Sequence, residues 1–594
     1  MTADHRGLAL IGPDLRKSAG QFFPCALILG IYLLCILVVN PRGEFPLNDD
    51  WSYVRSAFAF GSGQGLKVDQ WSAPSLVGQA LYGGLLTKIF SPHFLVLRIS
   101  TLFLSCCTAA LLWAIFRRTG IRRDLASVML MAWVFNPLQF SLAFTYMTEI
   151  PFIFFLALAF YLYILHLDTG KLPCLALSAA VLGYAYLIRQ TALFFILALV
   201  CGVLVDARKS VSKRMHEAMW AAGASGIFVV CYYLWILADG GATAAVRRKF
   251  ELLNYLESRQ IIGNSYGMLF YLAFMIMPVL IFLIPSAYRL SLGFPRIVRL
   301  GIPVVWGAVV VAGLWWFQAQ YTPLDYLPST TYHARMPFLL NVLYDSGLGP
   351  ITLDPAYFGA PPTPIYPRLW LGITVIVAAG AVLYGSLSVF GLLRLRRIPL
   401  FRKQRPLIVF AGVSLICLAA FEVLFSHIQE GGLFDRHILI VAFPFCLLIG
   451  IFASSGGEGD ERKPGPAIWV PVGFTCVALL AFCTAATHDY MEWNRVRWSL
   501  GRELLERGVD PLRIVGGFEF NAWNNYDTFA ARGNIGSVHY WWYDRRDYLI
   551  SMTPEEGFRI LQAKSYFSWV HRQPVCLYVL RNSAFEVRDR EIHE

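Results

Sequence analysis

The apolar stretch FFPCALILGIYLLCILVV, residues 22–39, decides the fold class of this chain. It contains no charged side chain, and crossing about 30 Å of hydrocarbon takes roughly 20 such residues in a helix. Stretches of the same character follow at residues 125–144, 150–165 and 369–389. In lipid every backbone polar group must be satisfied within its own helix, so these runs predict an all-α polytopic membrane protein.

Composition and charge support this class. Of the 594 residues, 57% are hydrophobic and 15% are charged, whereas about a quarter of the residues of a soluble chain are charged. The formal net charge is +12, but the basic residues fall in short loops between apolar runs, as at Arg117-Arg118 and Arg208-Lys209. This positive-inside pattern predicts contact with membrane lipids and no nucleic-acid partner.

Hydropathy predicts about thirteen transmembrane helices. Arg6, Arg16 and Lys17 precede the first span and predict a cytoplasmic N-terminus, so an odd number of spans places the C-terminus outside. The expected spans are 18–40, 95–116, 124–145, 149–166, 172–189, 191–206, 216–238, 266–286, 298–317, 368–392, 406–426, 437–454 and 466–487.

Most of the non-helical sequence is predicted to face outward. We expect a transmembrane domain at residues 1–487, whose outer loops are 41–94, 238–264 and 318–367, followed by a soluble domain at residues 488–594. Loop 41–94 holds an apolar stretch at Leu76–Phe90, which predicts one or two helices lying along the membrane interface. Residues 238–264 predict a surface helix.

The composition of residues 488–594 is that of a small α/β domain. Tyr490–Gly508 has the pattern of an amphipathic helix, and Arg513–Phe518 and Val575–Leu580 have strand patterns. A capping box at Thr553-Pro554-Glu555-Glu556 predicts a further helix to about Ala563.

Two adjacent acids, Asp49 and Asp50, stand shortly after the first span. Adjacent carboxylates repel each other, so at least one is expected to have a raised pKa unless a cation compensates. In a partly dry cleft such a carboxylate can accept a proton from a sugar hydroxyl. The alternative is a solvated loop start in which Asn48 is a turn residue.

Glu149 lies in a very short turn, Thr148-Glu149-Ile150-Pro151, between two apolar runs. An acid at membrane depth costs a few kcal/mol and is by default a functional residue. The alternative is a helix N-terminus in which Thr148 caps, Glu149 complements the helix dipole and Pro151 occupies the first turn.

Arg189 interrupts the apolar sequence in Leu187-Ile188-Arg189-Gln190-Thr191, and Arg436-His437 follow Asp435 at the start of another span. A guanidinium binds phosphate through two parallel hydrogen bonds, so these are candidate phosphate ligands. The alternatives are snorkelling of Arg189 to lipid headgroups and a surface contact between Asp435 and Arg436.

The motifs resemble those of the GT-C superfamily of polyprenyl-phosphate-dependent glycosyltransferases. More narrowly, they look like those of bacterial relatives of protein O-mannosyltransferases and of the lipid A aminoarabinose transferase. Relatives often have Asp at the position of Glu149, Lys at that of Arg189 and Arg-Tyr at that of Arg436-His437. The motifs that carry the resemblance are Asn48-Asp49-Asp50-Trp51, Thr148-Glu149-Ile150-Pro151, Leu187-Ile188-Arg189-Gln190-Thr191 and Asp435-Arg436-His437-Ile438-Leu439.

The resemblance implies an inverting sugar transfer from a polyprenyl-phosphate donor to a glycan, lipid or protein acceptor. The reaction would take place on the outer, periplasmic face of a bacterial inner membrane. Asp49 or Asp50 would be the general base. Glu149 would bind acceptor or sugar, or help to hold a cation. Arg189 and Arg436, with His437, would bind the phosphate as it leaves, where fixed cations stabilise the transition state most.

Further candidates are weaker. Loop 318–367 is a candidate lid over the site, because loops of this length are usually functional, and it contains His333 and Arg335. Trp523 is either an acceptor contact or part of a packing core. Asp50 and Glu149 are candidate ligands for Mg²⁺ or Mn²⁺, but no ligand spacing demands a metal cofactor.

Two rival functions belong to other classes. A transporter or flippase of polyprenyl-linked lipids or glycans predicts internal repeats with paired broken helices, and the sequence shows no matching halves. A non-catalytic scaffold for envelope assembly would tolerate neutral residues at Asp49, Asp50 and Glu149.

Overall fold

The computed structural model describes the greater part of the chain. Its residues are 12–238, 243, 258–320, 339, 341–344, 347–350, 367–394, 399–426, 433–454, 465–533 and 542–584. Of the expected surface helix at 238–264, residues 239–242 and 244–257 lie outside the described residues.

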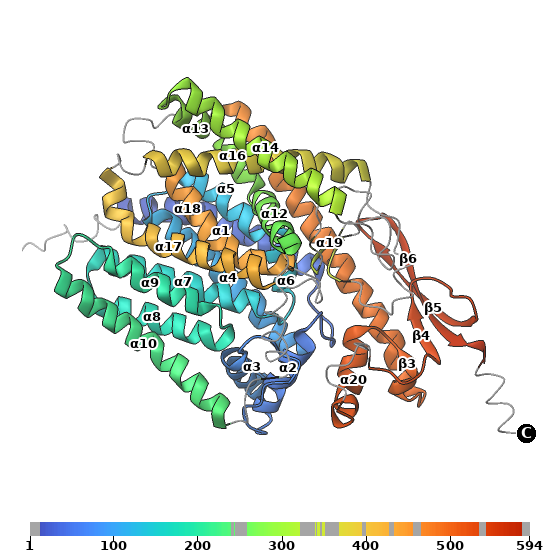
Figure 1. Ribbon diagram of the computed structural model, residues 1–594. Coiled ribbons are helices and arrows are strands. Elements are labelled where there is room, and N and C mark those ends of the chain that lie inside the picture. Colours follow the sequence, from blue (N-terminus) through green and yellow to red (C-terminus); the bar gives the residue numbers. More distant parts are fainter. Residues whose placement is uncertain are drawn as a thin grey trace, which may run out of the picture.

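The chain is mostly helical, with a small sheet region near its C-terminus (Figure 1). Its helices are α1 (Gly12–Val39), α2 (Asp50–Gly61), α3 (Val77–Phe90), α4 (Phe94–Arg118), α5 (Arg123–Val134), α6 (Pro137–Ala143), α7 (Glu149–Thr169), α8 (Leu172–Ile188), α9 (Ala192–Leu204), α10 (Val211–Ala238), α12 (Ser258–Met275), α13 (Met277–Leu292), α14 (Arg296–Gln320), α16 (Pro367–Arg394), α17 (Pro399–Phe425), α18 (Asp435–Ser454), α19 (Pro466–Glu506) and α20 (Phe518–Ala531).

The expected membrane architecture is confirmed. Within the described ranges, nine helices are long and apolar enough to cross a membrane, and the number rises to eleven if each of two bent helix pairs is one span. The shorter apolar helices α8 and α9 occupy the two remaining expected spans. The sequence thus folds as a polytopic all-α membrane domain, as its hydropathy predicts.

Two spans predicted as single helices are broken. The span at 124–145 is the pair α5 and α6, bent by 56°, and that at 266–286 is the pair α12 and α13, bent by 84°. At the first break Asn136 caps α6 by accepting a hydrogen bond from the backbone N–H of Leu138 at 2.9 Å, ahead of Pro137. At the second, Pro278 stands in the first turn of α13. Proline suits the start of a new helix better than the middle of one, because it has no backbone N–H.

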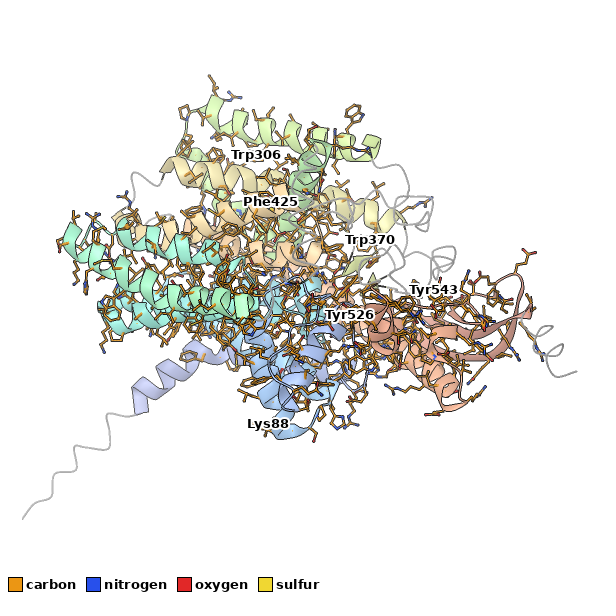
Figure 2. The ribbon with its side chains drawn as sticks, turned by 60° about the horizontal axis from the view of Figure 1, so that its bottom comes forward. Lys88, Trp306, Trp370, Phe425, Tyr526 and Tyr543 are labelled. Atoms are coloured by element: carbon orange, nitrogen blue, oxygen red, sulfur yellow. The ribbon has the colours of Figure 1, made fainter. Side chains whose placement is uncertain are left out.

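The bundle core is built from aromatic and aliphatic side chains of neighbouring helices (Figure 2). Phe160 of α7 stacks on Phe410 of α17, with ring centroids 3.9 Å apart. Large apolar side chains also point outward, and Leu37 and Phe474 are 72% and 75% exposed. Such an outer surface requires lipid as its solvent.

One end of the bundle carries α2, α3 and the C-terminal sheet, and we call it the domain end. The sheet has the strand order β3-β4-β6-β5, formed by β3 (Ile514–Val515), β4 (Tyr548–Ser551), β6 (Gln573–Asn582) and β5 (Phe558–Ser568). Strands β3 and β4 are parallel, and the other pairs are antiparallel. A short hairpin lies within the sequence of the longest loop, 318–367. Its strands, β1 (Leu343–Tyr344) and β2 (Gly347–Leu348), have two residues each.

The expectations for the C-terminal region are partly wrong. The helix predicted from Thr553 to Ala563 is absent, because strand β5 already begins at Phe558 and pairs with β6. The strand predicted at 513–518 is reduced to Ile514–Val515, and α20 begins at Phe518. Strand β6 and the amphipathic helix are present.

Helix α19 links the bundle to the sheet without a break. It runs from Pro466 to Glu506 and contains both the last expected span and the amphipathic segment. The domain boundary proposed at 487/488 therefore falls inside a continuous helix.

Candidate active site

Four charged side chains from distant parts of the sequence meet at the domain end. They come from the loop before α2 (Asp49), the start of α7 (Glu149), the break between α8 and α9 (Arg189) and the start of α18 (Arg436). We call these four residues the acid–guanidinium cluster. The cluster forms because each element ends or begins at this end of the bundle.

Arg436 is the centre of the cluster. Its side chain is 8% exposed, its Nη2 lies 2.9 Å from Oδ2 of Asp49, and its Nε lies 3.7 Å from Oε1 of Glu149. The guanidinium also lies over the ring of Phe434, 5.1 Å from the centroid. Its buried Nε and Nη1 have no hydrogen-bond acceptor among the described residues. A buried guanidinium with open donors is suited to receive an anion.

Glu149 and Arg189 form the second half of the cluster. Nη1 of Arg189 donates to Oε1 of Glu149 at 2.7 Å and to Oγ1 of Thr148 at 2.9 Å. Arg189 ends α8 with extended backbone, which turns the chain into α9. Thr148 makes no side-chain capping bond to α7, so Glu149 stands in the first turn without the expected threonine cap. The second oxygen of Glu149, Oε2, is buried and has no hydrogen-bond donor among the described residues.

Asp49 and Asp50 have different surroundings. Asp50 is 2% exposed, and its two oxygens accept the backbone N–H groups of Leu47 at 2.6 Å and Tyr146 at 2.9 Å. Burial raises the pKa of Asp50 to about 7, so desolvation and not repulsion by its neighbour is the main cause of the expected shift. The side chain of Asp49 is 22% exposed and faces Arg436, with Nε1 of Trp71 3.4 Å from Oδ1. Neither acid is a freely solvated loop residue.

Asp435, Arg436 and His437 contact three different partners. The fully buried Asp435 accepts the backbone N–H groups of Val342 at 3.1 Å and Leu343 at 2.7 Å, so the surface contact with Arg436 considered above is wrong. Nδ1 of His437 lies 3.1 Å from Oε2 of Glu422, and Glu422 is not one of the four residues of the acid–guanidinium cluster.

Several residues that hold this region together were not among the predicted site residues. Arg98 of α4 donates to the carbonyl oxygens of Pro41, Gly43, Phe45 and Phe144 at 2.7–2.9 Å. It thereby ties the loop that carries Asp49 to the segment before Glu149. An arginine inside the apolar run 95–116 is the signal that could have found it.

The C-terminal domain also contacts the loop before α2. Oε1 of Glu519 accepts the backbone N–H of Asn48 at 3.0 Å, and its Oε2 pairs with Arg497 at 2.9 Å. The amide of Asn48 donates to Oδ1 of Asn341 at 3.1 Å. The C-terminal domain and the long loop thus both contact the residue next to Asp49.

The remaining candidates lie elsewhere. Trp523 packs its ring against Phe94 and Phe58, with centroids 5.0 and 6.4 Å apart, in the contact between α20 and the bundle. His333 and Arg335 lie outside the described residues. In the described part of the chain, no group of three or more His, Cys, Asp or Glu could hold a metal ion. Asp50 directs both oxygens to backbone N–H groups and Glu149 faces arginines, so this pair does not form a metal site.

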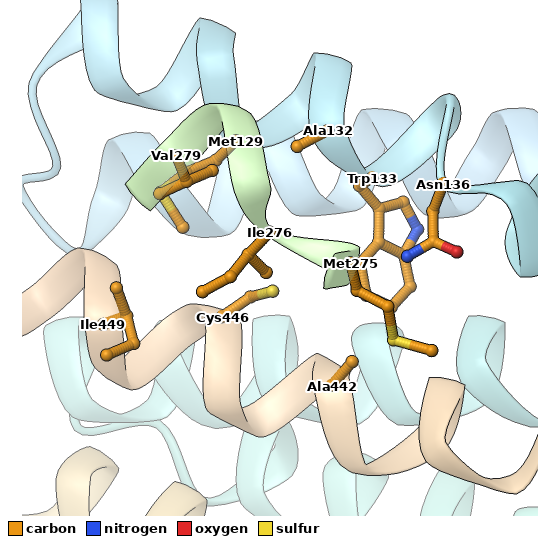
Figure 3. A pocket seen from close by; sticks show the side chains of 10 residues that line it. All are labelled: Met129, Ala132, Trp133, Asn136, Met275, Ile276, Val279, Ala442, Cys446 and Ile449. Atoms are coloured by element: carbon orange, nitrogen blue, oxygen red, sulfur yellow. The ribbon is translucent and has the colours of Figure 1, made fainter. Parts of the chain in front are cut away.

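A small cavity lies inside the bundle, apart from the cluster (Figure 3). It is located where the two broken spans bend, and α18 closes it. Its lining is almost wholly apolar: Met129, Ala132, Trp133, Asn136, Met275, Ile276, Val279, Ala442, Cys446 and Ile449. None of the cluster residues lines it.

Comparison with known proteins gives a family match over part of the chain. A family model matches the segment from α3 to α10, which carries both Glu149 and Arg189. The match covers about a quarter of the chain, and over that segment the chain is similar to a family of membrane glycosyltransferases. The matching model is that of the dolichyl-phosphate-mannose-protein mannosyltransferases, over residues 79–236, and over this segment the resemblance expected from the motifs is confirmed.

Among solved structures, the chain is similar to ArnT from Cupriavidus metallidurans in the apo state. The sequences are 11% identical, the alignment covers 74% of this chain and 78% of that chain, and the TM-score is 0.34. A comparison with curated protein sequences gives no match.

Proposed function

We propose that this protein transfers a hexosyl or pentosyl group from a polyprenyl-phosphate donor to a glycan, lipid or protein acceptor of the cell envelope. The reaction is an inverting single displacement on the outer, periplasmic face of a bacterial inner membrane. The proposal rests on the acid–guanidinium cluster, and above all on Arg436, a buried cation with two open donors beside a partly exposed carboxylate.

Arg436 and Arg189 are the phosphate ligands in this proposal. Nε and Nη1 of Arg436 are the donors that a phosphate would take up. The side chain of Arg189 is 12% exposed and contacts the same oxygen of Glu149 as Arg436 does. Glu149 keeps the two guanidinium groups together by contacting both. Fixed cations stabilise a phosphate leaving group most as its charge develops in the transition state.

Asp49 is the general base in this proposal, and Asp50 positions it. Asp50 is 2% exposed and each of its oxygens accepts a backbone N–H group, so burial keeps it from a substrate. Oδ2 of Asp49 contacts Arg436, while Oδ1 has only the 3.4 Å contact with Trp71. Oδ1 is therefore the oxygen that can receive a proton from an acceptor hydroxyl.

The chemical step balances with these residues alone. The acceptor hydroxyl oxygen attacks the anomeric carbon from the face opposite the phosphate, forming the new glycosidic bond as the bond from carbon to phosphate oxygen breaks. The hydroxyl proton passes to Asp49, and the electron pair leaves with the polyprenyl phosphate, whose charge Arg436 and Arg189 stabilise. Polyprenyl phosphate leaves as an anion and needs no acid to protonate it.

The test uses the full chain in lipid nanodiscs with a panel of radiolabelled polyprenyl-phosphate sugars and cell-envelope extract as acceptor source. We expect release of polyprenyl phosphate by the wild type, and a decrease of roughly 10²–10³-fold in Arg436→Gln. Asp527→Asn is the matched control, because that carboxylate is 77% exposed on α20 and pairs with Arg55, away from the cluster.

Two outcomes would overturn the proposal. One is the absence of turnover with every donor and extract by a folded wild-type protein. The other is wild-type turnover in Arg436→Gln.

A further inference from the structure

The hairpin of β5 and β6 runs back along α19 toward the bundle (Figure 1). Lys564 of β5 lies 3.1 Å from the hydroxyl of Ser499, and Gln562 lies 2.8 Å from Glu503. Farther along the strand, Ser568 contacts Asp489. Strand residue numbers rise as helix residue numbers fall, so the turn of the hairpin, residues 569–572, is its end nearest the membrane span.

Asp489 clamps this turn to α19. Its carboxylate accepts the hydroxyl of Ser568 at 2.6 Å and the backbone N–H groups of Trp569 at 2.8 Å and Val570 at 3.0 Å. The ring of Trp569 stacks on His488, with centroids 3.6 Å apart and an interplanar angle of 9°. The turn is therefore held at a fixed height along the helix.

That height is the edge of the apolar part of α19. Val470, Phe474 and Val477 are 74%, 75% and 65% exposed, which marks a lipid-facing surface. After this surface, the first residues of the Asp, Glu, His, Lys or Arg type are His488 and Asp489. The clamp that holds the turn thus stands where the helix leaves hydrocarbon for the headgroup region.

The turn itself presents aromatic side chains outward. Phe567 is 55% exposed and pairs across the hairpin with Pro574, and Trp569 is 39% exposed. Arg572 in the turn is also exposed. An exposed phenylalanine, a tryptophan and a cation at one level are the composition of a membrane-interface anchor, because aromatic rings favour the headgroup region and arginine binds lipid phosphate.

We infer that residues 567–574 of the hairpin dip into the headgroup region of the leaflet at the domain end and contact phospholipid. Lipid is the expected partner of this surface, because residues 567–574 lie beside the point where the lipid-facing side of α19 ends. The anchor gives the C-terminal domain a second attachment to the membrane besides α19. This inference does not depend on the proposed sugar transfer.

The test is photo-crosslinking of the full chain in nanodiscs of phosphatidylethanolamine and phosphatidylglycerol. A photoreactive phenylalanine analogue is placed at Phe567 and, as the matched control, at Leu561. Leu561 is 38% exposed on the same strand but lies at the distant end, next to the residue that contacts Glu503. We expect phospholipid adducts at Phe567 to exceed those at Leu561 by about tenfold, in proportion to the lipid concentrations at the two depths.

A second variant tests the clamp. Asp489→Ala removes the acceptor of three hydrogen bonds, and with the analogue at Phe567 we expect the lipid adducts to decrease severalfold while the protein stays folded. Equal adducts at Phe567 and Leu561, no lipid adduct at Phe567, or adducts to a second copy of the chain in place of lipid would each overturn the inference.

Discussion

Asp49 and Asp50 show how a single residue step separates two roles. Asp50 begins α2 and turns its carboxylate inward onto two backbone N–H groups, while Asp49 precedes the helix and faces Arg436. A buried acid held by backbone donors is a structural element, whereas a partly exposed acid beside a cation is available for chemistry.

The first prediction follows from this difference. Asp49→Asn should lower kcat by roughly 10²–10⁴-fold, because general-base catalysis contributes that much, and should leave donor binding in place. Asp50→Asn should keep a larger share of kcat and lose stability instead. Single-turnover assays with donor-binding measurements distinguish the two. Loss of turnover in Asp50→Asn alone, with its fold intact, would reverse the assignment.

The second prediction concerns pH. Burial raises the pKa of Asp50 from 3.8 to about 7, so the folded state prefers the protonated acid. The stability that this preference contributes is fully present below the unfolded pKa and is lost as pH rises through about 7. The melting temperature of the wild type relative to Asp50→Asn should therefore be higher at pH 5 than at pH 8. A difference that does not change with pH would contradict the raised pKa.

At the residue scale the sequence identified the charged residues but not their pairing. Charge is rare beside apolar runs, which makes Asp49, Glu149, Arg189 and Arg436 candidate site residues, and the structure brings these four together. The partners of Asp435 and His437 could not be predicted, because they come from other elements, the β1–β2 hairpin and α17, whose packing the sequence does not show.

At the element scale, hydropathy located the helices and missed their bends. Apolar composition is the same on both sides of Asn136 and Ile276, so a hydropathy window continues through each break. The prolines at 137 and 278 were the available signal, and their effect depends on packing that the sequence does not show. The helix predicted from Thr553 is wrong for a similar reason. The local capping pattern favours a helix there, but pairing with β6 makes the following residues strand β5.

The third prediction concerns the β1–β2 hairpin. Asp435 receives the backbone N–H groups of Val342 and Leu343 and so holds this hairpin beside Arg436. In Asp435→Ala these two amides should exchange hydrogen at least about tenfold faster, because each loses a buried acceptor. Hydrogen-exchange mass spectrometry measures this, with the amides of β6 as internal control. Unchanged exchange at residues 342 and 343 would show that other contacts hold the hairpin.

At the scale of the whole molecule, one buried carboxylate, that of Glu519, joins the C-terminal domain to the loop of Asp49. Arg497 of α19 and Glu519 of α20 are both fully buried, and Glu519 also accepts the backbone N–H of Asn48. Domain packing and the position of the proposed base therefore depend on the same carboxylate.

The fourth prediction tests that dependence. Glu519→Ala should destabilise the protein by about 3–5 kcal/mol, because it leaves a buried guanidinium without its partner. It should also lower kcat through the loop of Asn48. Replacement of both residues by leucine should restore part of the stability and none of the activity lost with the Asn48 contact. Thermal unfolding and turnover on the same samples check this, and an unaffected melting temperature in Glu519→Ala would contradict it.

The sequence predicted which parts the molecule contains better than it predicted how they are joined. A membrane domain followed by a small domain with strands follows from hydropathy and from the change of composition near His488. That α19 passes through the boundary unbroken could not be predicted, because the helix pattern merely changes from apolar to amphipathic there.

Because α19 is unbroken, a change in the tilt of its membrane span would move the C-terminal domain. The 41 residues of α19 extend about 60 Å at 1.5 Å per residue, so a tilt of about 10° displaces the far end by about 10 Å. A membrane helix can accommodate a mismatch between its apolar length and the bilayer thickness by changing its tilt. A thinner or thicker membrane would thus pull on Asn48 through Glu519, and the proposed catalytic loop would sense the mechanical state of the lipid around it.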